Sequence, residues 1–161
     1  MSEKDMFVQG WEKEFATTMK VLRAYPGSKL ELKPASSSRS AKELAWALVG
    51  GEMLVDGILK GDINAGSPPA PPSSMDEIIR AYEQTHREMV PKVRKLADTE
   101  YQKPIKFITG PGTMGDIPRN QVLWFLLMDS IHHRGQFSVY LRMAGGKVPS
   151  IYGPSGDEPW M

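Results

Sequence analysis

Three short patterns in the sequence mark the starts of helices. Ser2, Ser40 and Ser74 each precede an acidic residue by three positions, as in a capping box, where each of the two side chains accepts a hydrogen bond from the other residue's backbone N–H. Apolar residues at helical spacing follow each pattern. The three apolar stripes are Phe7, Trp11, Phe15, Met19 and Leu22; Leu44, Leu48, Gly51, Val55 and Ile58; and Ile78, Tyr82, Met89, Val93 and Leu96. We expect the first helix to stop at residues 25–27 and the second near Gly61.

A fourth helix, the longest, is predicted from the region of residues 116–118 to the glycine pair 145–146. Proline is favoured in a first helical turn, and glycine suits a left-handed C-terminal cap. In the third helix, Pro91 predicts a kink, because its ring removes a backbone donor and clashes with the preceding turn. The Pro/Ser-rich stretch 66–74 is expected to be a connector, and residues 99–116 to be mainly loop with at most a short extended piece.

The number and spacing of these segments predict the fold class. No stretch shows the sustained apolar/polar alternation of a strand, so the expected fold is all-α, a four-helix bundle with one or more long crossover connections. The 161 residues are 40% hydrophobic and contain no composition break of the kind that marks an interdomain linker. We therefore expect a single domain over residues 1–161, in which residues 147–161 form an irregular C-terminal tail.

Composition argues against several classes of function. The 20 Lys and Arg residues nearly balance the 19 Asp and Glu residues, and no Lys/Arg run is long enough to follow a phosphate backbone, so we expect no nucleic-acid partner. The absence of cysteine removes thiolate metal sites, cysteine nucleophiles and disulfides. The N-terminus is charged where a signal peptide is apolar, and no apolar run approaches the roughly twenty residues of a membrane span. The expected location is cytoplasmic, with no membrane contact.

The stretch MDSIHHRGQFSVYLR, residues 128–142, concentrates polar side chains in the fourth predicted helix. At about 100° per residue, Asp129, His133 and Gln136 share a face with apolar residues and are expected inside the apolar stripe. The apolar members of that face are Val122, Phe125, Leu126 and Tyr140. Arg134 points roughly the opposite way and is expected to be a solvated or interface charge.

Two interpretations of the Asp129 and His133 pair remain open. An Asp and a His four residues apart on a helix can aim at one point, as metal ligands do. Alternatively, the carboxylate accepts a hydrogen bond from the imidazole and orients it, which requires no metal. Two candidate ligands fall short of the three or four that a metal site normally has.

Two longer stretches resemble a known family. IHHRGQFSVYLRMAGGKVPSIYGP is similar to the last-helix signature of the DinB/YfiT-like superfamily, and SSRSAKELAWALVGGE resembles the second helix of the same proteins. The resemblance implies a bundle with up-down-down-up order, commonly assembled as a homodimer. It also implies, as in many members, a divalent metal such as nickel or zinc held by three histidines, one from the second helix and an HxxxH pair from the last. Members with assigned activity are metal-dependent hydrolases or thiol-dependent transferases and isomerases.

The implied metal ligands are only partly present in this chain. His133 matches the second histidine of the HxxxH pair, Asp129 stands at the first, and Ala47 occupies the place of the second-helix histidine. An aspartate can bind a divalent cation, but alanine has no donor atom. Glu43 lies one turn before Ala47, but its expected role is that of capping partner to Ser40.

Other residues near the implied site have ordinary structural explanations. Glu52 lies about 140° from Ala47 around the second helix and is expected to point elsewhere. His86 lies about 40° from the centre of the third apolar stripe and is expected at the core boundary. The small residues Ala47, Gly50 and Gly51 are expected to allow either close helix packing or a pocket.

These residues predict a DinB-like dimeric bundle that binds no metal, or binds one weakly, and takes a small-molecule ligand in a small polar pocket. The predicted pocket residues are Asp129, His133, Gln136, Ala47 and Gly51. The alternative is a divalent-metal-dependent hydrolase or thiol-dependent transferase in which Asp129 and His133 hold nickel or zinc, and the cation activates water or a thiol. The homodimer is also expected from QVLWFLLM, residues 121–128, which is apolar around its whole circumference and needs cover on more than one side.

Overall fold

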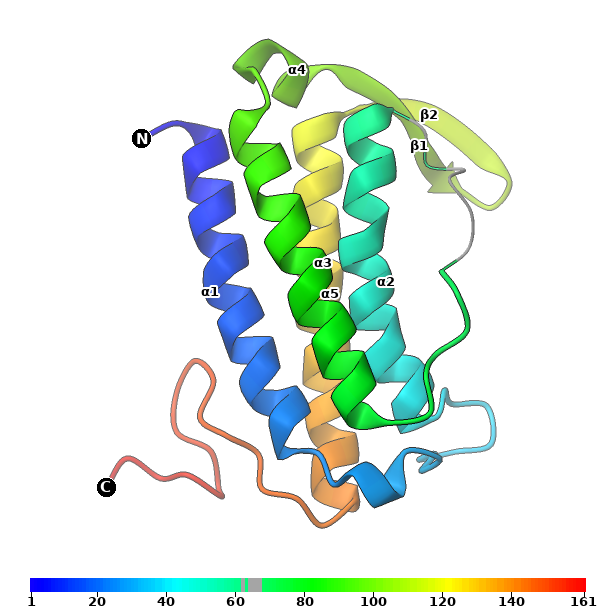
Figure 1. Cartoon of the computed structure of the whole chain (residues 1–161), viewed down its shortest axis with the longest axis vertical. Helices are drawn as coiled ribbons and strands as arrows, with labels where there is room; N and C mark the ends of the chain where they lie inside the picture. The colour runs from blue at the N-terminus through cyan, green and yellow to red at the C-terminus, as the bar shows by residue number, and fades with distance from the viewer. Residues whose placement is uncertain (62, 64–67) are drawn as a thin grey trace.

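Four long helices form the body of the computed structural model, which describes residues 1–61, 63 and 68–161 (Figure 1). The helices are α1 (Glu3–Ala24), α2 (Ala41–Lys60), α3 (Met75–Lys95) and α5 (Arg119–Met143), with a 3₁₀ turn, η1 (Gly27–Lys29), after α1. Each of the three predicted capping boxes is present, with both of its reciprocal hydrogen bonds, at the start of α1, α2 and α3. Gly61 ends α2 with a φ of 75°, a left-handed conformation that glycine adopts without steric penalty. These boundaries confirm the predicted helices.

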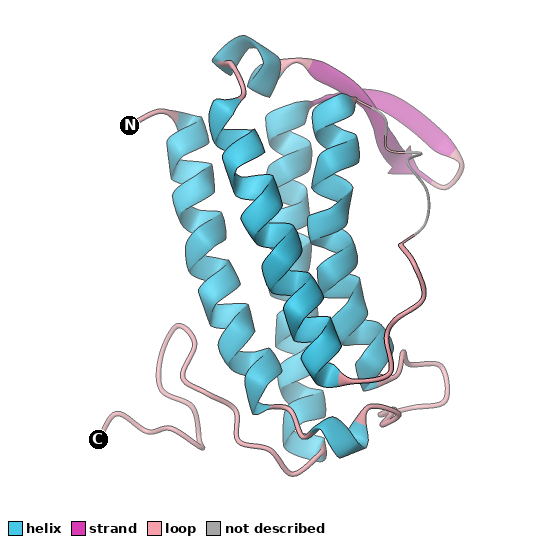
Figure 2. Ribbon diagram, in the orientation of Figure 1, coloured by secondary structure: helices cyan, strands magenta, loops and turns pink. Residues whose placement is uncertain are grey.

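Each long helix packs against two neighbours, α2 against α3 and α5, and α1 against the same two helices. Figure 1 shows α1 and α5 running down the view and α2 and α3 running up it. The described part of the connection before α3, residues 68–74, descends along the outside of the bundle (Figure 2) and is neither helix nor strand. Residues 66 and 67 of the predicted connector lie outside the described residues. The predicted all-α four-helix bundle is confirmed.

The expectation that residues 99–116 are mainly loop is wrong. The segment contains α4 (Asp98–Gln102) and an antiparallel hairpin of β1 (Pro104–Gly110) and β2 (Thr113–Pro118), which lie at the upper end of the bundle in Figure 2. Ile105 of β1 packs into the core, and Gly112 turns the chain between the strands with a φ of 65°. The alternation of inward and outward side chains covers only a few residues here, which is too short to stand out in a sequence.

The start and end of α5 follow the predicted signals. Pro118 is the N-cap of the helix, and Gly145 follows the C-terminus with a φ of 86°. Pro91 lies within α3, where the kink stays a prediction. Residues 147–161 contain no helix or strand. Among the helices that the structure describes, none is long and apolar enough to cross a membrane.

The core consists of two clusters of buried apolar side chains. One cluster, toward the lower end of the bundle in Figure 1, includes Leu22, Leu48 and Phe137; the other, toward the upper end, includes Phe7, Ile58 and Leu123. The buried ring of His86 contacts Phe15, which packs on the first cluster, and Trp11, which belongs to the second. The bundle therefore has a polar group where its two apolar clusters meet.

Candidate functional site

Asp129 and His133 form a pair on the side of α5 next to α2. His133 Nδ1 lies 3.2 Å from Asp129 Oδ2, and the two side chains are 18% and 41% exposed. The pair is therefore partly buried, whereas Gln136 is exposed, so the expectation that all three residues lie inside the apolar stripe is wrong for Gln136 and only partly met by the pair. The buried face of α5 centres on Leu123, Phe137 and Leu141, which leaves Asp129 and Gln136 at its edge.

Arg39, just before the Ser40 N-cap of α2, faces the other ring nitrogen of His133. Its Nη1 lies 3.4 Å from His133 Nε2, and its backbone carbonyl accepts a hydrogen bond of 2.9 Å from the Tyr140 hydroxyl. A guanidinium only donates, so His133 presents a lone pair on Nε2 and carries its hydrogen on Nδ1, beside the Asp129 carboxylate. The geometry therefore describes a neutral His133 whose Nε2 is an acceptor.

We expect His133 to titrate below the usual histidine pKa of about 6.5. Burial lowers the pKa of His133, the Asp129 carboxylate opposes this, and the positive charges of Arg39 and His132 lower it further. As the pH falls from about 6.5 through the folded-state pKa, the unfolded chain binds more protons than the folded one, so the folded state loses stability. An NMR titration of the ring checks the value, and Asp129→Asn should lower it further. A wild-type value above about 6.5 would contradict the assignment.

A hollow of about 500 Å³, the first hollow, opens beside the Asp129 and His133 pair, between α2, α5 and residues 68–71. Small residues of α2 line one side, and most of the remaining wall is apolar. Its lining includes Trp46, Ala47, Gly50, Gly51, Leu54 and Leu126. Trp46 Nε1 donates a hydrogen bond of 2.6 Å to the Pro69 carbonyl, which holds residues 68–71 against α2 as a wall.

Gly50 and Gly51 allow this wall and α5 to approach α2 closely. A Cβ on Gly50 would lie 3.2 Å from Pro68 Cγ, and a Cβ on Gly51 would lie 3.4 Å from Ser130 Oγ. A side chain at position 50 would therefore press on the proline wall, and one at position 51 would meet α5. Close packing and a pocket, the two outcomes expected from these small residues, occur side by side.

A second hollow of about 550 Å³ adjoins the first and shares Arg39 and His133 with it. Its other lining residues are Pro34, Ser38, Leu44, Gln136, Val139 and Tyr140. Four of the residues predicted to form the pocket line the first hollow: Ala47, Gly51, Asp129 and His133. The fifth, Gln136, lines the second hollow instead.

The first hollow lacks the three-ligand metal site that the family resemblance implies. Asp129 and His133 face each other, and Ala47 supplies no donor. The Glu43 carboxylate accepts a hydrogen bond of 2.6 Å from the Ser40 backbone N–H, and its bonds to Ser40 lower its pKa, as its capping role predicts. Glu43 is therefore no replacement for the missing ligand. In the described part of the chain, no three His, Asp or Glu side chains are placed to hold one metal ion.

A buried polar cluster lies deeper in the bundle and was missed by the spacing arguments. Glu52 is 3% exposed; its Oε1 accepts a hydrogen bond of 2.8 Å from Trp11 Nε1, and its Oε2 accepts one of 3.2 Å from His86 Nδ1. The His86 ring stacks on Phe15, with centroids 3.9 Å apart. The expectation of His86 at the core boundary is therefore wrong. A carboxylate within the apolar run of α2 was the signal for this cluster, because such a group requires buried donors.

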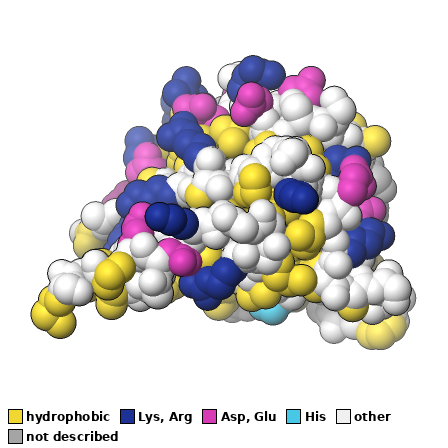
Figure 3. All heavy atoms as spheres, turned by 90° about the horizontal axis from the view of Figure 1, so that it is seen from below, with side chains coloured by type: hydrophobic (Ala, Val, Ile, Leu, Met, Phe, Trp, Pro, Cys, Tyr) yellow, Lys and Arg dark blue, Asp and Glu magenta, His cyan; other side chains and the backbone are white. Residues whose placement is uncertain are grey.

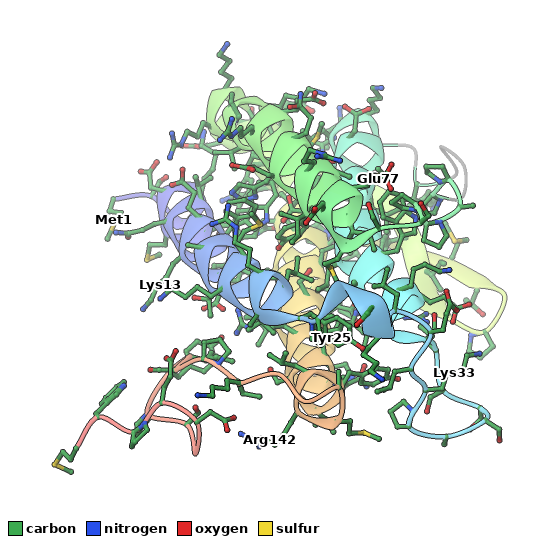
Figure 4. The ribbon with its side chains drawn as sticks, turned by 60° about the horizontal axis from the view of Figure 1, so that its bottom comes forward. Met1, Lys13, Tyr25, Lys33, Glu77 and Arg142 are labelled. Carbon is green, nitrogen blue, oxygen red and sulfur yellow. The ribbon has the colours of Figure 1, made fainter. Side chains whose placement is uncertain are left out.

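Arg134 is also buried, contrary to the expectation of a solvated or interface charge. Its Nη1 donates a hydrogen bond to Glu14 Oε2, and its Nη2 donates one to the Tyr152 hydroxyl. Each of these hydrogen bonds is 2.6 Å long. Arg134 therefore ties α5 to α1 and to the C-terminal segment. Figure 4 shows this segment beside the end of α5, where Arg142 is labelled. On the face seen from below, positive and negative side chains are interspersed (Figure 3).

Comparisons with known proteins agree with this fold. The DinB family model matches residues 1–160. The uncharacterized protein YrdA of Bacillus subtilis (strain 168) is 30% identical over 156 residues, which cover 96% of this chain and 90% of YrdA. A DinB-like protein of Bacillus cereus ATCC 10987 superimposes with a TM-score of 0.77 at 23% identity, over 91% of this chain and 95% of the other. The DinB-like protein YjoA of Bacillus subtilis superimposes with a TM-score of 0.69 at 18% identity, over 87% and 92% of the two chains.

Proposed function

The chain belongs to the DinB family, and on that premise we propose that it binds a small organic molecule in the first hollow without a resident metal ion. One observation carries the proposal. The two side chains that could ligate a cation, Asp129 and His133, face each other at 3.2 Å, and Ala47 stands where a third ligand would be needed. We therefore do not propose a hydrolase or transferase in which these two residues hold nickel or zinc.

The lining of the first hollow suits a ligand with an apolar body. Trp46, Leu54, Leu126 and residues 68–71 form its apolar walls, and its volume of about 500 Å³ is typical of small-molecule sites. Burial of apolar ligand surface against these walls provides affinity. Arg39 and His133 supply polar contacts at the end where the two hollows meet, and such contacts orient a ligand.

Filling the first hollow should weaken this binding. We expect the neutral fluorescent probe N-phenyl-1-naphthylamine to bind the wild-type protein, and Ala47→Phe to weaken its affinity by at least about tenfold, because the new ring occupies the hollow. A fluorescence titration measures the dissociation constant. Ala16→Phe, at an exposed position of α1, is the control and should leave it unchanged.

The same titration can contradict the proposal in two ways. Wild-type protein that does not bind the probe has no usable apolar hollow. Equal affinities in wild type and Ala47→Phe would place the probe elsewhere on the molecule. Thermal melts of the two phenylalanine variants establish that each is folded under the titration conditions.

A homodimer is part of the same proposal. Phe125 and Met128 of α5 are 52% and 58% exposed, and the Phe125 ring lies 5.9 Å from the ring of Phe107 on the hairpin. Ile108 and Met114 of the hairpin are exposed too. These side chains support an apolar contact between two copies across α5 and the hairpin.

Light scattering at micromolar concentration tests the homodimer. We expect a mass near twice the 17.9 kDa of the chain and, for Phe125→Glu, a shift toward the monomer, because a charge in an apolar contact is costly. Val139→Glu is the matched control on the same helix, at a similarly exposed position outside the proposed contact. A wild-type mass near 17.9 kDa would contradict the dimer.

A further inference from the structure

We infer that the molecule bound is an apolar carboxylate, with its carboxylate on Arg39 in the second hollow and its apolar part in the first. The inference rests on the proposed function of the first hollow and adds the chemical class of the ligand and its direction. The two hollows share Arg39 and His133, so a ligand that extends from one into the other passes this pair.

The charge of the second hollow favours an anion. Arg39 is the one permanently charged side chain among its lining residues, none of which is Asp or Glu. Ser38 adds a hydroxyl that can donate to an anion, and Gln136, whose Nε2 lies 3.0 Å from His132 Nε2, keeps its second amide N–H. A carboxylate in this hollow would therefore meet donors and no like charge.

Arg39 has donors free for such a group. Within the described residues, no carboxylate lies close enough to pair with its guanidinium, and its side chain contacts His133 Nε2 through Nη1 at 3.4 Å. A guanidinium presents five N–H donors in a plane that matches the two oxygens of a carboxylate. The Tyr140 hydroxyl fixes the backbone of Arg39, because it donates a hydrogen bond of 2.9 Å to the Arg39 carbonyl. The backbone of Arg39 is therefore held in position, and most donors of its exposed side chain stay available.

The charges of the first hollow set the direction of the ligand. Its two acidic residues, Glu43 and Asp129, would repel a carboxylate there. Trp46, Leu54 and Leu126 offer apolar contact in the same hollow. The apolar part of the ligand consequently belongs in the first hollow, and the anionic end belongs beyond His133 in the second.

Competition against N-phenyl-1-naphthylamine tests this class of ligand with octanoate and octan-1-ol, which share a chain and differ in charge. We expect octanoate to displace the probe from wild-type protein at a concentration at least about tenfold lower than octanol. Arg39→Gln should remove this preference by weakening octanoate and leaving octanol unchanged, and Arg39→Lys should keep part of it. The control is Lys13→Gln, which removes an exposed charge from α1 (Figure 4) and should preserve the preference.

A second readout reports where the carboxylate lies. The positive charge of Arg39 helps to lower the pKa of His133, so an anion bound to Arg39 should raise that pKa, whereas octanol should leave it unchanged. The His133 ring can be followed by NMR in the presence of each compound. A rise with octanoate alone supports binding at Arg39.

The outcomes separate this inference from the proposed function. Equal displacement by octanoate and octanol, or a preference that survives in Arg39→Gln, overturns the carboxylate and leaves the first hollow as a binding site. Stronger displacement by octylamine than by octanoate also overturns it, because the charged end would then lie at Asp129. A wild-type protein that does not bind the probe overturns both proposals.

Discussion

Replacing His86 with leucine is expected to lower the free energy of unfolding by about 3 to 5 kcal/mol, the range for leaving a buried carboxylate without one of its partners. Glu52 is 3% exposed and accepts hydrogen bonds from Trp11 and His86. In the variant, one of these donors is lost while the carboxylate stays in the core. The carboxylate then keeps its hydrogen bond from Trp11.

Chemical denaturation measures this loss, and two further variants identify its cause. The exposed His132 is the control, since His132→Leu should change the free energy of unfolding by no more than about 0.5 kcal/mol. Adding Glu52→Gln to His86→Leu should restore part of the stability, because the amide is neutral and its oxygen can still accept from Trp11. A double variant no more stable than His86→Leu would show that lost packing of the ring, rather than the stranded charge, causes the effect.

Arg134→Met is expected to lower the free energy of unfolding by about 2 to 4 kcal/mol. The buried guanidinium donates to Glu14 and to Tyr152, so its loss leaves the Glu14 carboxylate without its cation. The Glu14 side chain is 14% exposed and keeps some hydration, which makes this effect smaller than that of His86→Leu. The C-terminal segment should also be cleaved faster by proteases, because Tyr152 loses one of its anchors.

Arg142→Met is the matched control for Arg134→Met. Arg142 lies two turns further along α5 and pairs with Asp157, but its side chain is 59% exposed. An ion pair of this kind contributes about 0 to 1 kcal/mol. Equal losses in the two variants, measured by chemical denaturation, would mean that burial of Arg134 adds nothing to the stability of the bundle.

Local signals in the sequence were sufficient to predict the four long helices. Serine and carboxylate capping pairs and the closing Gly61 are decided within one helical turn, and the structure has them where they were predicted. The orientation of α5 was not predictable in this way, because residues 121–128 are apolar on all sides and fix no buried face. Contacts with α1 and α2 decide that face. This explains why Arg134 proved buried and Gln136 exposed.

The candidate site was predictable where it depends on one helix. Spacing along α5 brought Asp129 and His133 together, and the family resemblance placed Ala47 opposite them. Arg39 and the wall of residues 68–71 come from connections between helices, whose positions depend on long-range packing. No periodic pattern marks such residues in a sequence. Arg39 and the wall of residues 68–71 therefore emerged only from the structure.

A calorimetric titration of Ni²⁺ and Zn²⁺ into metal-stripped wild-type protein tests metal-independent binding most directly. We predict no site with a dissociation constant tighter than about 100 µM, and the same affinity for N-phenyl-1-naphthylamine with and without a chelator. Ala47→His serves as the positive control, because it supplies a third donor beside Asp129 and His133 and should tighten metal binding. Micromolar or tighter binding of either metal by the wild type, abolished by His133→Ala, would contradict a metal-free site.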